Sequence, residues 1–435
     1  MSIRRYTVCQ KPMSKAKVIR TRVPHISKNM LAIARVVGRL YLISFIGAAR
    51  ISVQGIQYMV ESFRRSLNKE SRSLLVYRHQ NGAEPQILGW FILFKLKKYA
   101  LKARVSFALK PHIIFVHGYE VLRWGGPLAR TVLPRLGAVP IYHAKIDSKS
   151  MKTLYRTVFD GPYPLTIAPE GQVSYFTDYI PRLESGPVRI AFQAAERLDC
   201  PVELLPVSIF MHYNRRGEKQ MWRILQKIER CIGIKSEENQ PFEERVRRCR
   251  DSILEINEQR YHISHEEGAS FEARAGVVME AALTACESIL GIQEKGESFS
   301  RMHALRQRCW DAMFPDSLNY IPIKRAIADI QAGTAWYASR HLELFDILYY
   351  FCVPVPDCDA PLRARIEYVQ ELYDFVNRTM GGAFKDRITI KPTRVVISTE
   401  KPINITEYLE DYHSNHKKTI ADINQKLNEA YRHIH

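Results

Sequence analysis

Short apolar runs of strand length alternate with amphipathic stretches of helical spacing through the first half of the chain. The stretches include residues 148–159 and 187–197, where apolar positions recur with a helical period. An earlier run, residues 51–58, begins with β-branched residues and reaches a turn at Gly55. Strands that alternate with helices predict an α/β domain. The strand-length runs lie at residues 73–77, 113–116, 139–142, 165–168 and 202–210.

The helix expected after residues 73–77 has two contrasting halves. Pro85 suits the first turn of a helix, so the helix is expected over residues 86–101. Its first half is apolar, and a group of cations follows. Apolar bulk beside cations fits docking on a lipid surface, whereas the alternative is a buried helix with a solvated end. The cations are Lys95, Lys97, Lys98, Lys102 and Arg104.

The second half of the chain has a different pattern. Residues 215–385 are charged, helical in period and poor in strand patterns, which predicts a helical insert. Two short strands are expected within residues 388–397, and a helix over residues 406–434. In the first half, the Gly- and Trp-rich residues 124–127 are expected to form a turn.

The chain is strongly basic, and its charge is uneven. It has 64 Lys and Arg against 45 Asp and Glu, a net charge of +19 over 435 residues, which requires an anionic partner. Residues 1–60 contain eleven Lys or Arg and no acidic residue. Such an arm attracts anionic lipid head groups. A solvated basic tail and a mitochondrial transit peptide are the alternatives.

Residues 30–49 are the best candidate for a membrane helix. Arg35 and Arg39 interrupt them, and the longest uncharged stretch, residues 40–49, is too short to span a bilayer. We therefore expect an amphipathic segment that lies in the membrane interface, with a helix packed on the core as the alternative.

The cysteines and the basic pattern limit other functions. None of the eight cysteines has CxxC spacing, so neither a zinc site nor a redox motif is indicated, and reduced thiols in a reducing compartment are expected. No secretory signal is evident. A nucleic-acid-binding protein is compatible with the charge, but the basic residues are not interleaved with an aromatic RNA-binding pattern. No nucleic-acid partner is expected.

His79 and Glu84 are the first candidate catalytic pair. His79 ends an expected strand, and Glu84 follows five residues later at the start of an expected helix. A turn between them can bring both side chains together. A carboxylate on one imidazole nitrogen fixes the tautomer, and the other nitrogen can then take a proton from a hydroxyl. A surface ion pair or a helix cap is the structural alternative.

Glu170 and Gly171 form a second element. They follow the apolar run at residues 165–168, and strand ends are where α/β domains place ligands. Glycine permits close backbone approach. Glu170 could hold a substrate hydroxyl or an oxyanion-hole loop, or it could be a simple turn carboxylate.

With these residues in order, the sequence resembles the glycerolipid acyltransferases, whose type member acylates 1-acylglycerol-3-phosphate. The first family block, a His followed five residues later by an Asp, corresponds to His79 and Glu84, with the acid changed from Asp to Glu. The second, a Gly before a strand that ends in Arg, matches residues 137–143. The third matches Pro169-Glu170-Gly171, and the fourth, an apolar strand with a proline, matches residues 200–207.

The resemblance implies a fold and a division of the chain. The fold would be α/β, with a central mixed sheet flanked by helices. Residues 1–60 would be a basic membrane-associating segment, 61–214 the acyltransferase core, and 215–385 a helical insert. Residues 386–435 would return as strands and a C-terminal helix of the core.

The resemblance also implies a chemistry. His79, oriented by Glu84, would deprotonate a lipid hydroxyl that attacks the thioester of acyl-CoA or acyl carrier protein. Neither metal nor other cofactor is implied. The protein would associate with membrane lipids at the cytoplasmic face, and its oligomeric state is not predicted.

The acceptor is left open by two departures from the family. The arginines of the second and third blocks, which are implicated in phosphate binding, are replaced by His143 and Val173. Arg123 and Arg130 are candidate substitutes, with Glu170, Gly171 and His143 completing the expected acceptor site. The alternatives are acylation of glycerol-3-phosphate or of a non-phosphate lipid, and a catalytically inactive lipid-binding relative.

Overall fold

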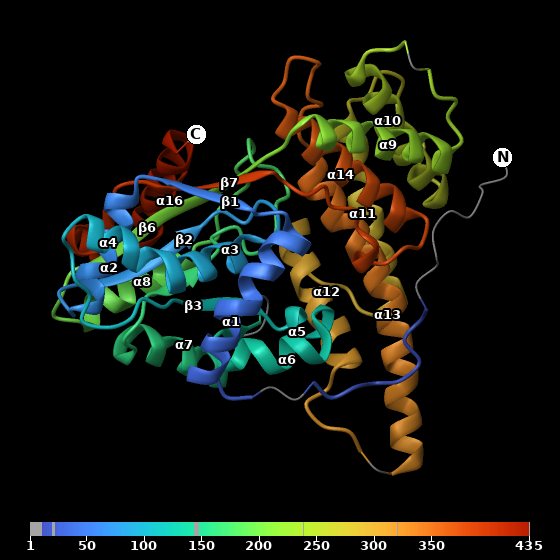
Figure 1. Ribbon diagram of the computed structural model, residues 1–435. Helices are drawn as coiled ribbons and strands as arrows, with labels where there is room; N and C mark the ends of the chain where they lie inside the picture. Colours follow the sequence, from blue (N-terminus) through green and yellow to red (C-terminus); the bar gives the residue numbers. More distant parts are fainter. Residues whose placement is uncertain (1–10, 20–21, 143–147, 238, 320, 435) are drawn as a thin grey trace. The chain divides into compact units, whose positions relative to one another are not determined.

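The computed structural model describes residues 11–19, 22–142, 148–237, 239–319 and 321–434, and it forms two compact units (Figure 1). One, here called the α/β unit, lies within Thr21–Tyr142, Ile146–Asn214 and Lys391–His435. The other, here called the helical unit, is formed chiefly by Arg215–Ile390, together with residues of Met1–Arg20. Each unit is described separately.

An eight-stranded mixed sheet forms the centre of the α/β unit within the described residues. Its order is β1-β7-β6-β2-β5-β3-β4, with β8 also beside β6. The β6–β7 and β6–β8 pairs are antiparallel, and the other pairs are parallel. In Figure 1, β1 and β7 lie side by side although they come from opposite ends of the chain. The strands are β1 (Arg50–Gln54), β2 (Arg72–Tyr77), β3 (Ile114–Gly118), β4 (Val139–Ile141), β5 (Leu165–Ile167), β6 (Val202–His212), β7 (Arg394–Thr399) and β8 (Ile403–Asn404).

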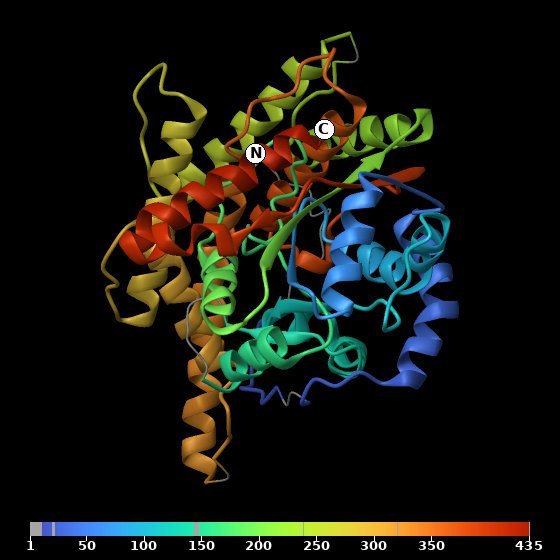
Figure 2. The same ribbon diagram turned by 90° about the vertical axis from the view of Figure 1, so that its left-hand side faces the viewer.

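Helices cover both faces of this sheet, because its central strands are apolar on both sides. In β2, Leu74 and Val76 belong to one apolar cluster, and Leu75 and Tyr77 to the other. The first cluster includes α7 (Ser148–Asp160), α8 (Gly186–Arg197) and α16 (His416–His433). The second includes α2 (Ile56–Leu67), α3 (Glu84–Phe91), the π-helical η2 (Ile92–Leu96) and α4 (Lys97–Lys102). Figure 2 shows α16 in red and α2 in blue on opposite sides of the strands. The predicted α/β class, with a mixed sheet flanked by helices, is confirmed.

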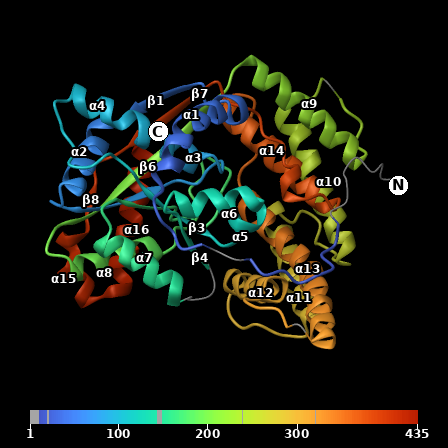
Figure 3. The ribbon, with the colours of Figure 1, turned by 60° about the horizontal axis from the view of Figure 1, so that its bottom comes forward.

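The helical unit occupies the stretch of chain between β6 and β7. Its long helix α13 packs against α11 and α12, as Figure 3 shows, and their apolar cluster includes Leu305, Trp336 and Phe345. The N-terminal residues also contribute, since Lys17 N–H donates to Met313 O at 3.0 Å. The described elements are α9 (Arg215–Ile232), α10 (Phe242–Arg260), α11 (Phe271–Leu290), α12 (Ser298–Met313), α13 (Pro322–Phe351), α14 (Leu362–Thr379) and η3 (Phe384–Asp386).

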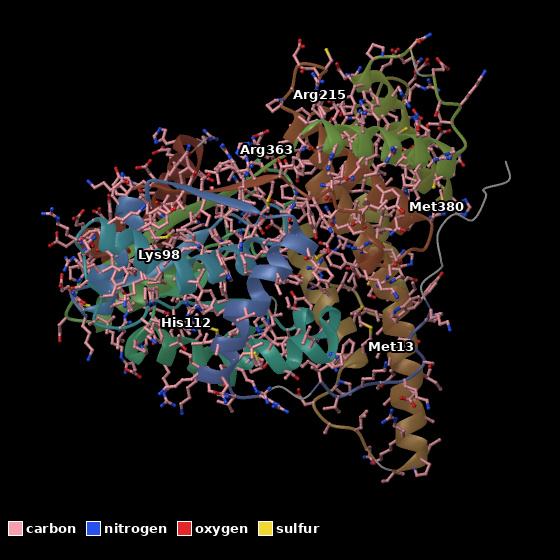
Figure 4. The ribbon with its side chains drawn as sticks, viewed as in Figure 1. Met13, Lys98, His112, Arg215, Arg363 and Met380 are labelled. Atoms are coloured by element: carbon pink, nitrogen blue, oxygen red, sulfur yellow. The ribbon has the colours of Figure 1, made fainter. Side chains whose placement is uncertain are left out.

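The helix after β2 is buried, so the expectation that it faces lipid is wrong. Ile87, Leu88 and Phe91 lie in the core of the α/β unit, where they cover the sheet. Only the cationic end is solvated, and Lys98, labelled in Figure 4, is exposed. Composition alone could not distinguish an apolar face that meets lipid from one that meets a sheet.

The turn expected at residues 124–127 is confirmed, since Gly125 forms a turn between α5 (Glu120–Trp124) and α6 (Gly126–Arg135), and Pro127 lies in the first turn of α6. Two further expectations differ from the structure. The strand expected before Pro392 is absent from the described residues, since the backbone N–H of Ile390 donates to the Gln370 side chain instead. The C-terminal helix is split into η4 (Ile405–Tyr408), α15 (Leu409–Ser414) and α16, with Asn415 capping α16.

The N-terminal apolar segment forms one continuous helical stretch. Helix α1 (Lys28–Tyr41) continues without a break into the π-helical η1 (Leu42–Ile46). Together they form 19 residues that are long and apolar enough to cross a membrane by length and composition, so the expectation that this segment is too short is wrong. Signal sequences and core helices pass the same test, but a core helix does not fit because only 6% of the segment is buried.

Candidate active site

His79 stands just beyond the end of β2. The backbone N–H of Arg78 donates to Val207 O at 2.9 Å, and the chain then turns away from the sheet. Side chains alternate along a strand, so Tyr77 and His79 point to one face and Arg78 to the other. The turn passes through Gly82, whose φ of +90° suits glycine, and reaches Glu84 as the first residue of α3.

The His79 and Glu84 side chains are in hydrogen-bonding contact. The distance from His79 Nδ1 to Glu84 Oε2 is 3.0 Å, and the Glu84 side chain is fully buried. The carboxylate also accepts from the backbone N–H groups of Gln80 at 3.1 Å and Gly82 at 2.8 Å. A carboxylate in this position only accepts, so Nδ1 donates and Nε2 keeps its lone pair. The Glu84 side chain therefore spans the turn and reaches the His79 ring.

The Nε2 side of the ring is accessible. The His79 side chain is 18% exposed, and no other described residue forms a hydrogen bond with Nε2. The Tyr77 ring meets the imidazole edge-on, with centroids 5.5 Å apart. Burial raises the pKa of Tyr77 well above its usual value, so the phenol stays neutral. His79 is thus arranged to accept a proton from a hydroxyl that approaches Nε2.

Glu170 holds the backbone of His79. Its side chain is fully buried, one oxygen pairs with Arg78 Nε, and the other accepts from His79 N–H at 3.2 Å. Ser174 N–H donates to His79 O at 2.8 Å. Both backbone groups of His79 are therefore bonded to the loop after β5. Both carboxylate oxygens of Glu170 are thus used on Arg78 and on the backbone of His79, and its expected roles toward a hydroxyl or an oxyanion-hole loop stay predictions.

Gly171 allows that loop to turn. Its φ is +75°, and its N–H donates to Ala168 O at 3.3 Å. An added Cβ would meet only the Glu184 side chain, at an ordinary 3.5 Å. The backbone conformation, more than a close approach, is what requires glycine here.

Arg78 is a site residue that the sequence reasoning did not identify. It is buried, and besides Glu170 its guanidinium donates to Tyr179 O at 2.7 Å and Phe176 O at 3.3 Å. Its cation lies 5.8 Å from the ring centre of Tyr431 on α16. A signal for Arg78 was present in the sequence, because this cation directly follows the buried apolar run of β2. A cation in such a buried position needs a carboxylate as its partner.

The expected acceptor residues follow strands that end at the same edge of the sheet. Strands β2, β5, β3 and β4 are mutually parallel, so the loops after them gather at one edge. Arg130 lies on α6, where its Nε donates to Leu122 O at 2.8 Å. His143 and the side chain of Arg123 lie outside the described residues. Their acceptor roles stay predictions.

A second His-and-acid pattern lies in the helical unit. His341 and Asp346 have the same spacing as His79 and Glu84, but both lie on α13. His341 Nδ1 bonds Tyr261 Oη at 2.6 Å, and Asp346 pairs with Arg306. Both residues lie within the stretch that the sequence predicted to be helical, and neither follows a strand.

Comparisons with known proteins assign no family to this chain, so its function is inferred from the residues and geometry of the site. No protein-family model matches this chain, and no curated protein matches it. Within the described part of the chain, no three His, Cys, Asp or Glu side chains gather in a way that could hold a metal ion.

Proposed function

We propose that this protein is a membrane-surface O-acyltransferase, in which His79 is the general base and Glu84 orients it. The observation that carries the proposal is the 3.0 Å contact between His79 Nδ1 and a fully buried Glu84 carboxylate. A surface ion pair would not require its carboxylate to be fully buried or to accept hydrogen bonds from two backbone N–H groups, as Glu84 does. The mixed sheet flanked by helices supports a glycerolipid acyltransferase-like fold.

The reaction begins with a lipid hydroxyl at His79 Nε2. The imidazole takes the proton as the oxygen attacks the carbonyl of an acyl thioester. The C–S bond then breaks, the new C–O ester bond remains, and the imidazolium returns the proton to the leaving thiolate. Glu84 stabilises the imidazolium that forms in between, which is the usual role of a carboxylate on Nδ1. The acyl donor is acyl-CoA or acyl carrier protein.

The segment formed by α1 and η1, in the same unit as His79, supports the proposal that the protein works at a lipid surface. Gly38 lies against Trp90 of α3, where an added Cβ would come within 3.2 Å of the indole ring. The Arg39 guanidinium also lies 5.1 Å from the centre of that ring. The segment also exposes large apolar side chains, including Phe45 at 71% exposure. An apolar face beside cations is the pattern of a segment that enters the membrane interface or the bilayer. The other exposed members are Ile33, Val36, Val37, Leu40 and Ile43.

An acceptor panel tests the proposal. The full chain is incubated with labelled acyl-CoA or acyl carrier protein and, in separate reactions, with 1-acylglycerol-3-phosphate, glycerol-3-phosphate, or lysolipids without a phosphomonoester. Labelled ester on one acceptor class supports the proposal and identifies the acceptor. Binding to the lipids with no ester on any acceptor contradicts it and favours an inactive lipid-binding relative.

A further inference from the structure

A cavity of about 740 Å³ lies in the α/β unit where η1 leads into β1 and β6 ends. It contains none of the residues of the His79 site. Its size is within the range of small-molecule pockets. The lining residues are Gly47, Ala49, Arg50, His212, Asn214, Pro392, Thr393 and Arg394.

Two arginines lie side by side in this cavity. Arg50 of β1 is the register partner of Arg394 of β7, and Arg394 is in turn the partner of His212 of β6. Register partners project from the same face of a sheet, with Cβ atoms about 5 Å apart. The three side chains therefore form one row across three strands.

Nothing in the described part of the chain neutralises the two arginines. Both are exposed, and neither forms a hydrogen bond or ion pair with a described residue. No carboxylate lines the cavity. Like charges directly opposite each other destabilise a sheet, so this pair costs stability unless an anion joins it.

The neighbouring cations show what ordinary structural pairing looks like here. Arg39 donates to Ala48 O at 3.1 Å and to Ala49 O at 2.6 Å. Lys391 Nζ donates to Ser44 O. These two cations bond the carbonyls at the end of η1, whereas Arg50 and Arg394 bond no described group.

We propose that Arg50 and Arg394 bind the phosphate group of an organic phosphate in this cavity. Two guanidinium groups offer parallel N–H donors that match phosphate oxygens, and such charge-assisted bonds are the stronger kind. The cavity has room for more than a bare phosphate ion. The ligand is either a phospholipid head group, beside the exposed apolar face that ends at Phe45, or a soluble phosphate ester.

This site is separate from the His79 site, so it goes beyond the proposed function. Tyr77 of β2 is the register partner of Val207 of β6, and His212 lies five residues further along β6. At about 3.3 Å per residue, the arginine row is roughly 17 Å beyond the level of Tyr77. An odd number of residues also turns the row to the opposite face of the sheet from Tyr77 and His79. A phosphate held there is not the phosphate of a glycerol being acylated at His79.

Two binding measurements test the site with one double variant, Arg50→Gln with Arg394→Gln. The first titrates the full chain with soluble glycerol phosphate by calorimetry, and the second measures flotation with phosphatidylcholine vesicles with and without phosphatidic acid. The control is Lys97→Gln with Lys98→Gln, which removes the same charge from two exposed lysines of α4 in the same unit. Circular dichroism checks that both variants fold.

We expect wild type and the lysine control to bind, and the arginine variant to lose about tenfold or more in affinity for one probe. If the arginine variant loses affinity for glycerol phosphate, with or without a loss for the vesicles, the site binds phosphate esters. If it loses affinity only for vesicles that contain phosphatidic acid, the site binds a lipid head group. Equal losses in both variants would reveal nonspecific charge attraction and overturn the proposal. If wild type binds neither probe, the proposal is overturned as well.

Discussion

Replacing Arg78 by methionine tests whether the buried ion pair beneath the candidate site holds the α/β unit together. The substitution removes the guanidinium that pairs with Glu170 and donates to Tyr179 O and Phe176 O. Methionine preserves much of the apolar length of the side chain. The Glu170 carboxylate then stays buried, and its one remaining partner among the described residues is the N–H of His79.

The expected loss is large because one partner of a buried pair is left behind. Arg78 and Glu170 are 1% and 0% exposed, so water cannot replace the missing cation. Breaking such a pair costs about 3–5 kcal/mol, against a total of about 5–15 kcal/mol for a typical folded protein. Removing both charges, with Glu170→Met added to Arg78→Met, should cost about 2 kcal/mol less than the sum of the single changes.

Hydrogen exchange at a series of denaturant concentrations measures this loss on peptides from β2 and β6. These peptides report on the α/β unit alone, which matters because the two units need not unfold together. The control is Arg72→Met on the same strand, since Arg72 donates only to Gly161 O and Phe159 O and leaves no carboxylate unpaired. We expect the control to lose about 1–2 kcal/mol. An Arg78 variant as stable as the control, or additive losses in the double variant, would refute the reasoning.

Three further predictions concern the dyad, pH and one tight turn. Glu84→Gln should lower acyl transfer by about 10²-fold or more in kcat with the fold intact, because an amide cannot accept all three hydrogen bonds, and steady-state kinetics with circular dichroism checks this. Burial lowers the pKa of the His112 and His117 imidazoles in the folded protein. Their contribution to stability is therefore complete above the unfolded-state pKa of 6.5 and is lost as pH falls below it. Urea midpoints should drop between about pH 7.5 and about pH 5.5, and by less in a variant with both histidines replaced by Gln. Gly55→Ala should destabilise the unit by several kcal/mol, since its φ is +66° and a Cβ would lie 2.0 Å from a backbone carbonyl oxygen. Gly126→Ala, at φ +60° with open space around it, should cost only about 1–2 kcal/mol, and thermal melts of both variants check the difference.

The strand and helix alternation was predictable because each apolar run has strand length and is bounded by turn residues. The pairing of strands that lie far apart in the sequence was less predictable. Residues 394–397 were expected to return to the domain as its last strand, yet their position between β1 and β6, antiparallel to β6, depends on contacts with both ends of the chain. Local pattern carries no information about such contacts. The same limit explains the wrong expectation for the helix after β2, whose apolar face meets the sheet.

For the candidate site, His79 and Glu84 were predicted from their spacing across a short turn together with Pro169-Glu170-Gly171 and the family resemblance. Arg78 was missed since its partner, Glu170, follows another strand and meets it only through the parallel pairing of β2 with β5. The contacts of Glu170 were missed for the same reason. Its carboxylate is used inside the protein, on the backbone of His79.

Acyl transfer by a His79→Ala variant is the most direct test of the central claim. His413→Ala is the matched control, since His413 also pairs with a glutamate, Glu196 at 3.0 Å, but on an exposed surface. With the acceptor that wild type uses, the account predicts a loss of at least about 10²-fold for His79→Ala, an unchanged rate for His413→Ala, and native circular dichroism for both. Acyl transfer by folded His79→Ala at a rate near that of wild type would contradict it.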